Sequence, residues 1–358
     1  MYHLSSINNL KHLCAKYGLA PSKKYGQNFL IDPEPINKMI EAADVGPNDT
    51  VVEIGPGFGP LTFALAEKAK KVLAFEIEKK LIPYWESFGC HSDRASQRVE
   101  ESLGFGVMDS SALRSLSRLS RGSAQNDKCN NLEIIWGNVL HEVESPKSKV
   151  QSLGKYKVIA NIPYQITSEV IRKFLEAPNK PDLMVLMVQK EVAERICAKA
   201  GDMSVLAVSV QLYAEPEIIM PVPRSSFWPQ PKVDSAVIKL SIKQSECFYP
   251  PLTKRGQGGV AGDGGTSATP PNLLLERGGN DEDFFKIVKA GFANRRKMLI
   301  KNLSTVADKK KLPALFHELG INEKARAQEL SVEQWQELVS KLSFHRLSRG
   351  NPDNFIGY

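Results

Sequence analysis

The chain has 358 residues, of which 42% are hydrophobic and 24% are charged. This balance suits a globular protein with a sizeable core and excludes a fibrous or broadly disordered chain. No apolar run reaches the roughly 20 residues that a membrane-spanning helix needs, and the N-terminal residues lack the pattern of a secretory signal. We therefore expect a cytoplasmic protein that does not enter a membrane.

The formal net charge of +7 and the pI near 9.0 favour an anionic partner. The basic residues are unevenly distributed, since the segment from Met1 to Ile31 contains lysines but no acidic residue. A second basic group lies far along the chain. We interpret both groups as sites that contact the phosphates of a nucleic acid, through Lys23, Lys24, Arg295, Arg296 and Lys297.

The five cysteines are scattered and form no Cys-x-x-Cys pair. None has a histidine nearby at the spacing of a metal site, so we expect neither a zinc site nor a disulfide framework.

The N-terminal part is predicted to begin with an amphipathic helix over Ser6–Tyr17. The segment Lys23–Asp32 mixes basic, amide and aromatic residues without periodicity, which is typical of a loop, and a helix over Ile36–Ala43 follows. Two interpretations of this loop are equally compatible with its composition: a lid over a ligand, and a strap that holds the domain edge.

The stretch Thr50–Thr62 predicts a strand, a tight glycine turn and the start of a helix that continues to Ala69. Gly55, Gly57 and Gly59 can adopt positive φ and carry no Cβ, so a ligand can approach the backbone closely. Such a turn also serves tight packing, so it does not identify a ligand by itself.

A second predicted strand, Lys71–Glu76, ends in an acid placed to bind the hydroxyls of a ribose. Pro60 stands where a dinucleotide site would have its third glycine. With no pyrophosphate to hold, we expect the mononucleoside S-adenosylmethionine (SAM) as cofactor in place of NAD.

A helix is expected to run from Glu76 to about Phe88, and the next stretch, Gly89–Asn131, is crowded with serine and arginine. Its weak apolar periodicity predicts a flexible surface insertion. Beyond it strands and helices alternate, which predicts a mostly parallel sheet covered on both faces. The expected elements are the strands Leu132–Trp136, Tyr156–Ile162 and Leu183–Val188, and the helices Thr167–Leu175, Lys190–Lys199 and Ser204–Tyr213.

Two further strands, Glu217–Met220 and Ala236–Ile242, are separated by the proline-rich link Pro221–Pro231. The predicted domains are a catalytic domain over 1–249 with its insertion at about 89–131, a glycine-rich linker over 250–281, a helical domain over 282–345 and a disordered tail over 346–358. The expected helices of the small domain are Phe284–Leu303, Leu312–Leu319 and Val332–Leu342.

The tetrapeptide Asn161-Ile162-Pro163-Tyr164 follows a predicted strand, at the edge of the sheet where open α/β folds bind ligands. The Asn161 side-chain oxygen and a backbone carbonyl next to Pro163 can accept the two N–H bonds of an exocyclic amino group, and so localise its lone pair for attack on a methyl sulfonium. Tyr164 offers a flat face for stacking on a base. The tetrapeptide alone would equally fit an ordinary turn. Cytosine C5 chemistry is disfavoured because no Pro-Cys nucleophile motif occurs.

Five stretches in this order resemble the small-subunit rRNA adenine N6,N6-dimethyltransferases: Lys24–Asp32, Val52–Thr62, Asn161–Tyr164, Gln189–Ala193 and Pro223–Ser235. The resemblance implies an α/β, Rossmann-like class I SAM-dependent methyltransferase sheet of seven mostly parallel strands with a small all-α C-terminal domain. It also implies transfer of methyl groups from SAM to two adjacent adenosines in the 3′-terminal hairpin loop of 16S-type rRNA, in the assembling 30S-type subunit, by a monomer without a metal.

Matched by motif, the cofactor-contacting positions implied by the resemblance are Asn28, Leu30, Gly55, Gly57, Glu76, Asn138 and Asn161. The catalytic positions implied are Asn161, Pro163, Tyr164 and Phe227, with Phe227 as the second aromatic around a flipped adenine. The chain departs from the family at Asn138, where an Asp is usual. If the strand assignment is wrong, Asp109 is the alternative candidate for the role of this Asp.

Two alternatives remain open from the sequence. The macrolide-resistance dimethylases of large-subunit rRNA share the glycine turn and the Asn-x-Pro-aromatic motif. Mitochondrial relatives act as transcription factors, so a non-catalytic DNA-binding role is the second alternative. The stretch Pro229–Ser235 and the basic helix expected over Phe292–Lys297 favour the small-subunit branch, and the intact Asn161–Tyr164 motif favours catalysis.

Overall fold

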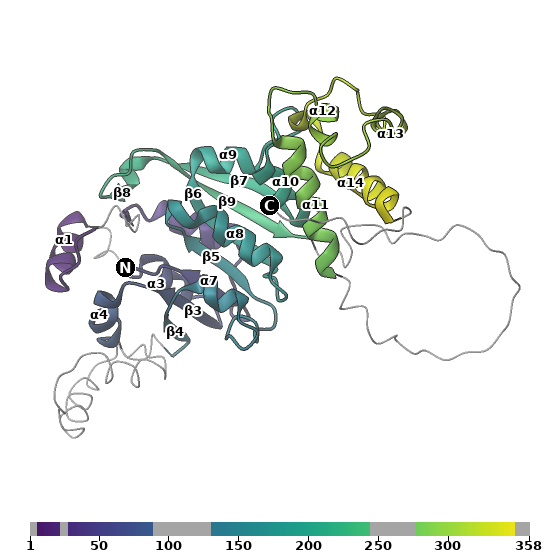
Figure 1. Cartoon of the computed structure of the whole chain (residues 1–358). Helices are drawn as coiled ribbons and strands as arrows, with labels where there is room; N and C mark the ends of the chain where they lie inside the picture. Colours follow the sequence, from purple (N-terminus) through teal and green to yellow (C-terminus); the bar gives the residue numbers. More distant parts are fainter. Residues whose placement is uncertain (1–5, 22–27, 89–129, 244–276, 348–358) are drawn as a thin grey trace, which may run out of the picture. The chain divides into compact units, whose positions relative to one another are not determined.

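The structure is a computed structural model that describes residues 6–21, 28–88, 130–243 and 277–347, with the backbone alone at 277–281 and 343–347 (Figure 1). Lys23, Lys24, Asp109, most of the predicted insertion, most of the glycine-rich linker and the tail after residue 347 lie outside the described residues. The chain divides into two compact units, Met1–Cys197 with Ala214–Lys243, and Ala198–Tyr213 with Gln244–Tyr358.

The first unit is built on a seven-stranded sheet in the order β4-β3-β2-β5-β6-β9-β7 (Figure 1). All neighbours are parallel except β9, which pairs antiparallel with both β6 and β7. This is the mostly parallel methyltransferase-like sheet expected from the sequence. The strands are β2 (Thr50–Ile54), β3 (Lys71–Glu76), β4 (Leu132–Trp136), β5 (Lys157–Asn161), β6 (Leu183–Gln189), β7 (Ala214–Val222) and β9 (Ser235–Ile242).

The order of the strands creates a switch point between β2 and β5. From β2 the chain passes outward to β3 and β4, and then returns to pair β5 on the other side of β2. Loops leaving β2 and β5 therefore diverge at the carboxyl edge of the sheet, which leaves a crevice between them. The glycine turn and the Asn161 tetrapeptide both begin at this edge.

Continuous apolar runs explain why the central strands are buried on both faces. Val51, Val52, Val158, Ile159 and Val185 are all fully buried. The helices and short 3-10 turns of this unit are α1 (Ile7–Lys16), α2 (Glu34–Ala42), α3 (Pro60–Ala66), η3 (Lys79–Leu81), α4 (Ile82–Glu86), α7 (Val139–Glu144), η5 (Tyr164–Ile166), α8 (Thr167–Glu176), α9 (Lys190–Ile196) and η6 (Arg224–Ser226).

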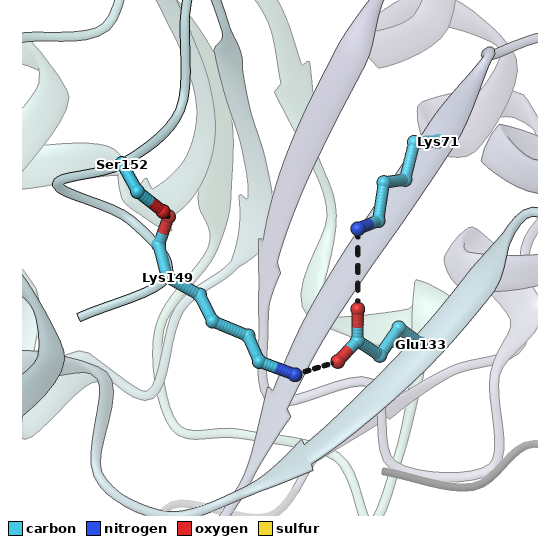
Figure 2. Close-up of polar contacts among 4 residues, drawn as sticks. All are labelled: Lys71, Glu133, Lys149 and Ser152. Atoms are coloured by element: carbon cyan, nitrogen blue, oxygen red, sulfur yellow. Dashed lines mark hydrogen bonds and ion pairs between the residues drawn. The ribbon is translucent and has the colours of Figure 1, made fainter. Parts of the chain in front are cut away.

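The edge strand β4 carries a charged cluster. Figure 2 shows Glu133 held between Lys71 of β3 and Lys149 from the loop after α7, with the Lys71 Nζ to Glu133 Oε2 distance 3.3 Å. The Ser152 hydroxyl donates a 2.8 Å hydrogen bond to the Lys149 carbonyl. Charged side chains on an edge strand discourage pairing with another chain, which matters more here than the small stabilisation from exposed ion pairs.

A separate two-stranded sheet joins β1 (Phe29–Leu30) to β8 (Phe227–Trp228) in antiparallel register. Phe29 pairs with Trp228 and Leu30 with Phe227. The sequence did not predict this pairing, because strands of two residues are too short to show an alternating pattern. The described end of the predicted lid or strap is therefore paired with the proline-rich link.

The second unit contains the helices α10 (Val205–Tyr213), α11 (Arg277–Phe292), α12 (Leu299–Leu303), α13 (Leu312–Glu318) and α14 (Val332–Leu347), with η7 (Ala327–Glu329). The fully buried Trp335 and Phe284 lie in its core. The helix α10, which the sequence assigned to the catalytic domain, belongs to this unit. The described helices include none that is both long and apolar enough to span a membrane.

The prediction of one helix over Phe284–Leu303 is wrong. Helix α11 ends at Phe292, and α12 begins only at Leu299. The buried Asn302 side chain explains the break, because its Nδ2 donates to the Gly291 carbonyl at 2.6 Å and to the Asn294 carbonyl at 3.0 Å. These bonds satisfy carbonyls at the end of α11 that a continuing helix would otherwise use. Local propensity could not reveal this tertiary contact.

The glycine turn after β2 depends on the absence of a side chain at Gly59. Gly59 has φ of +85°, and a Cβ there would lie 2.6 Å from Trp85 and 2.8 Å from Phe63. Trp85 is fully buried, and its Nε1 donates to the Gly57 carbonyl at 3.1 Å. The ring therefore has a fixed place against the turn.

We expect Gly59→Ala to destabilise the protein by about 1–3 kcal/mol or more, because overpacking adds to the strain of positive φ. Gly154→Ala is the matched control, since a Cβ at Gly154 has no neighbour within 4 Å and its φ is not in the positive region. Urea unfolding of both variants measures the difference. Equal stability of the two variants would contradict the tight packing at Gly59.

Candidate active site

A cavity of about 470 Å³ opens at the carboxyl edge of the sheet in the first unit. This volume lies within the range of about 300–1,000 Å³ that is usual for small-molecule sites. The cavity is lined by every residue that the sequence placed in the cofactor and catalytic sites: Asn28, Leu30, Gly55, Gly57, Glu76, Asn138, Asn161, Pro163, Tyr164 and Phe227. The structure thus brings together residues from six separate stretches, while their individual roles stay predictions.

The glycine turn forms one wall of the cavity. Gly55 and Gly57 have φ of +69° and +57°, so both occupy the left-handed region that a side chain would strain. The Gly55 N–H donates to the Phe75 carbonyl at 2.9 Å, which fixes the turn to β3. A Cβ at Gly57 would lie 3.5 Å from the Phe29 ring. Consequently, no side chain of Gly55 or Gly57 separates the backbone of the turn from the cavity.

Glu76 is almost fully buried, with 5% of its surface exposed, and its carboxylate is held by backbone N–H groups. Oε1 accepts from Ile77 and Glu78, each at 2.8 Å, and Oε2 accepts from Gly57 at 3.0 Å. Burial raises the pKa of Glu76, while these three hydrogen bonds oppose the rise. A carboxylate has about four acceptor positions, so one remains for a ligand hydroxyl.

Glu53 also lines the cavity and was not predicted as a site residue. It lies in β2, and only 2% of its surface is exposed. Neither its Oε2 nor the hydroxyl of the buried Thr62 has a hydrogen-bond partner among the described residues. Burial raises the pKa of Glu53 to about 8; the adjacent Thr62 side chain opposes the rise, and the nearby Glu76 adds to it. An acid inside an otherwise apolar strand was the available sequence signal.

Asn138 follows β4 and caps helix α7. Its side-chain Oδ1 accepts a 3.0 Å hydrogen bond from the Leu140 N–H, and the preceding Gly137 N–H donates to the Glu76 carbonyl at 2.9 Å. Asn and Asp are similarly good N-cap residues, so the capping role accepts either of them. The second lone pair of Oδ1 is compatible with the predicted contact to the cofactor's adenine.

The predicted catalytic tetrapeptide begins at Asn161, the last residue of β5. The Ile162 N–H donates to the Met187 carbonyl at 3.3 Å, and the Pro163 carbonyl accepts from the Ile166 N–H at 3.1 Å. Within the described part of the chain, no hydrogen bond occupies the Asn161 side chain or the Ile162 carbonyl. Of the Ile162 and Pro163 carbonyls, the one that is free to accept a hydrogen bond is therefore that of Ile162.

The two predicted aromatic residues both border this cavity. The Tyr164 hydroxyl lies 2.7 Å from the Ser235 hydroxyl of β9, and Ser235 is fully buried. Burial raises the pKa of Tyr164, the hydrogen bond to Ser235 opposes the rise, and Asp234 adds to it. Tyr164 is therefore a neutral phenol at physiological pH. Phe227 of β8 is buried, with 3% of its surface exposed.

The predicted RNA-binding residues that the structure describes lie in the second unit. Arg295, Arg296 and Lys297 occupy the turn between α11 and α12, and all three are exposed. The Arg295 Nε donates to Gln328 Oε1 at 3.1 Å, while Lys297 closes the turn through a 3.0 Å backbone bond to the Asn294 carbonyl. The break in the predicted helix thus presents the basic residues on a turn.

Residues 19–93 and 113–250 match the protein family described as "Ribosomal RNA adenine dimethylase". Two bacterial proteins, both called "Ribosomal RNA small subunit methyltransferase A", are similar over most of their length. The protein from Dehalococcoides mccartyi is 34% identical over 336 residues, which cover 93% of this chain and 92% of the relative. The protein from Bacillus cytotoxicus is 33% identical over 354 residues, which cover 97% of this chain and 100% of the relative.

Two solved structures are similar over most of the chain. A dimethyladenosine transferase from Plasmodium falciparum is 25% identical, with a TM-score of 0.59 over 89% of this chain and 98% of the other. The 23S rRNA methyltransferase ErmE is 24% identical, with a TM-score of 0.55 over 88% of this chain and 100% of the other. At its identity, the likeness to ErmE concerns the fold alone.

The buried Glu53 predicts a pH dependence of stability in the ligand-free protein. The unfolded chain loses this proton near pH 4.5 and the folded chain near pH 8, so unfolding releases a proton between these values. Wild-type stability should therefore fall as pH rises through this window, relative to Glu53→Gln, by up to about 1.4 kcal/mol per pH unit. Above pH 8 the difference should level off.

Urea unfolding of both proteins at pH 5, 6.5 and 8 measures this difference. A difference in stability that stays constant across the three pH values would contradict a raised Glu53 pKa.

Proposed function

The chain belongs to the ribosomal RNA adenine dimethylase family, and from this premise we propose that it transfers methyl groups from SAM to N6 of two adjacent adenosines in the 3′-terminal hairpin loop of small-subunit rRNA. The observation that carries the proposal is the position of the Asn161–Tyr164 turn and the glycine turn on one cavity.

The cavity suits SAM on three grounds. Its bare glycine wall allows close approach of a ligand, Glu76 retains an acceptor for a ribose hydroxyl, and Glu53 offers an unpartnered buried oxygen to a cationic or donor group. When bound, SAM supplies the electrophilic methyl group. We assign its binding to Asn28, Leu30, Gly55, Gly57, Glu76, Asn138 and Asn161.

Asn161 and the Ile162 carbonyl are assigned to the target amino group. The lone pair of an adenine N6 is delocalised into the ring, so the amino group is a poor nucleophile. The Asn161 side-chain oxygen and the Ile162 carbonyl can each accept one of its N–H bonds, which favours a tetrahedral nitrogen and stabilises the positive charge that develops on it. Pro163 fixes the turn between the two acceptors and the stacking residue, with φ of −54°.

Tyr164 and Phe227 are assigned to hold the flipped adenine by stacking. The hydrogen bond between the hydroxyls of Tyr164 and Ser235 restricts rotation of the phenol, and burial keeps the Phe227 ring in place. Stacking of this kind contributes about 1–3 kcal/mol per base. The base is then oriented before its amino group reaches the two acceptors.

The small-subunit assignment rests on the names of the relatives that are 33% and 34% identical to the chain. The fold likeness to a 23S enzyme does not favour the large subunit, because it concerns architecture alone. A non-catalytic role is disfavoured by an intact turn whose acceptors have no competing partners within the described residues.

The partner in this proposal is small-subunit rRNA within an assembling 30S-type subunit, bound in the cytoplasm by a monomer. Arg295, Arg296 and Lys297 are exposed and remain assigned to phosphates, together with Lys23 and Lys24, which lie outside the described residues.

We expect Asn161→Ala to reduce kcat for methyl transfer by at least about 100-fold, the scale of losing one transition-state acceptor. SAM affinity should change much less, because Asn161 is only one of the seven residues assigned to the cofactor and its oxygen is needed mainly as the adenine nitrogen becomes tetrahedral. Thermal stability should also change little, because the side chain makes no hydrogen bond to described residues. Incorporation of tritiated methyl groups into unmethylated small subunits measures kcat, and calorimetry measures SAM binding. Near-normal turnover of the Asn161→Ala enzyme would exclude this role.

RNA binding should depend steeply on salt, and each lost phosphate contact should reduce the log–log salt slope by about 0.7–0.9. We therefore expect Arg295→Gln and Arg296→Gln to reduce the slope, while Lys309→Gln and Lys310→Gln, exposed in the same unit, should leave it unchanged. Filter binding to small-subunit rRNA over a range of salt concentrations measures the slopes. Equal slopes for both pairs would remove Arg295 and Arg296 from the interface.

A further inference from the structure

The short sheet of β1 and β8 is fastened by side chains that no catalytic role explains. The Ile31 N–H donates to the Ser226 carbonyl at 2.9 Å, and the Ser226 hydroxyl donates to Asp32 Oδ2 at the same distance. The other carboxylate oxygen of Asp32 accepts from the Glu34 N–H at 3.0 Å, at the start of α2. We call the Asp32–Ser226 pair the clasp.

The clasp holds together two walls of the cavity. Leu30, on the side assigned to the cofactor, is paired directly opposite Phe227, on the side assigned to the target base. The two residues are almost 200 positions apart in sequence, and both line the same cavity. A ligand that orders either strand therefore also orders its partner.

The ribbon has little support from strand pairing. It contains two strands of two residues each and pairs with no other strand among the described residues. Isolated two-stranded ribbons are marginally stable at best. One anchor is Phe29, whose ring centroid lies 5.2 Å from that of Phe58 and 6.4 Å from that of Trp228. Leu30 and Phe227 also pack in the core, and the clasp adds a side-chain hydrogen bond at the end of the ribbon, where Ser226 is 5% exposed.

We propose that Asp32 and Ser226 are positioning residues that couple cofactor binding to capture of the target adenine, through the paired strands β1 and β8. This inference rests on the proposed function, because it takes Leu30 as a cofactor contact and Phe227 as a base contact. SAM bound against β1 stabilises β8 in the place where Phe227 stacks, and a base bound against Phe227 stabilises Leu30 in return. Coupling between binding sites is reciprocal, so each ligand strengthens the other by the same factor.

The test compares wild type with Ser226→Ala, which removes one hydroxyl. S-adenosylhomocysteine serves as an unreactive cofactor probe, and its Kd is measured with and without saturating unmethylated small ribosomal subunits. We expect the subunits to strengthen binding at least about fivefold in wild type and less than about twofold in Ser226→Ala. Ser225→Ala is the matched control, because Ser225 is the exposed neighbour and should keep the wild-type ratio.

The second partner of the clasp provides a rescue experiment. Asp32→Ala should lose the coupling, whereas Asp32→Asn should keep most of it, because the amide still offers a hydrogen-bonding group to the Ser226 hydroxyl. Adding Ser226→Ala to Asp32→Ala should have no further effect on the coupling. A purely structural role would instead lower the unfolding temperature without changing the ratio of the two Kd values.

The proposal is wrong if the coupling in Ser226→Ala is as strong as in wild type. It is also wrong if the wild-type enzyme methylates the subunits but shows no coupling. Failure of the proposed function has a different signature, since the wild type would then bind the probe but methylate no small-subunit RNA. In that case the role of the clasp is tested by the Kd of S-adenosylhomocysteine alone. An unchanged Kd in Ser226→Ala would exclude a part for the clasp in cofactor binding.

Discussion

A buried carboxylate ties together the two strand ends on which the site depends. Glu76, at the end of β3, accepts from the backbone of Gly57 in the turn that follows β2. Burying a charge is unfavourable, and three backbone hydrogen bonds compensate part of that penalty. The strained turn, with its positive φ values, is therefore held from the neighbouring strand and does not rely on its own sequence alone.

The switch point between β2 and β5 places the second half of the site opposite this turn. Asn161 ends β5, and the hairpin of β7 and β9 completes the sheet next to β6, which brings Ser235 to the Tyr164 hydroxyl. The antiparallel pair thus positions Tyr164, the residue proposed to stack on the base, although Tyr164 lies 71 positions before Ser235 in the chain. The two halves of the cavity are therefore built from the seven-stranded sheet together with the separate β1–β8 pair.

Much of this arrangement could be predicted from the sequence. Continuous apolar runs predicted the strands β2 to β6, and the motifs named ten residues that the structure places on one cavity. What could not be predicted depends on tertiary contacts: the β1–β8 pairing is too short for periodicity, and the break after Phe292 depends on Asn302. Glu53 was missed because its strand was assigned by its apolar neighbours.

We propose that the chain dimethylates two adjacent adenosines near the 3′ end of small-subunit rRNA. The direct measurement is primer extension across that hairpin, on unmethylated small subunits incubated with SAM and the purified wild-type protein. Because N6,N6-dimethyladenosine cannot form a Watson–Crick pair, the account predicts strong stops at the two adenosines with wild type and none with Asn161→Ala. Read-through of the hairpin with active, SAM-binding wild-type protein, or methylation only of large-subunit rRNA, would contradict the account.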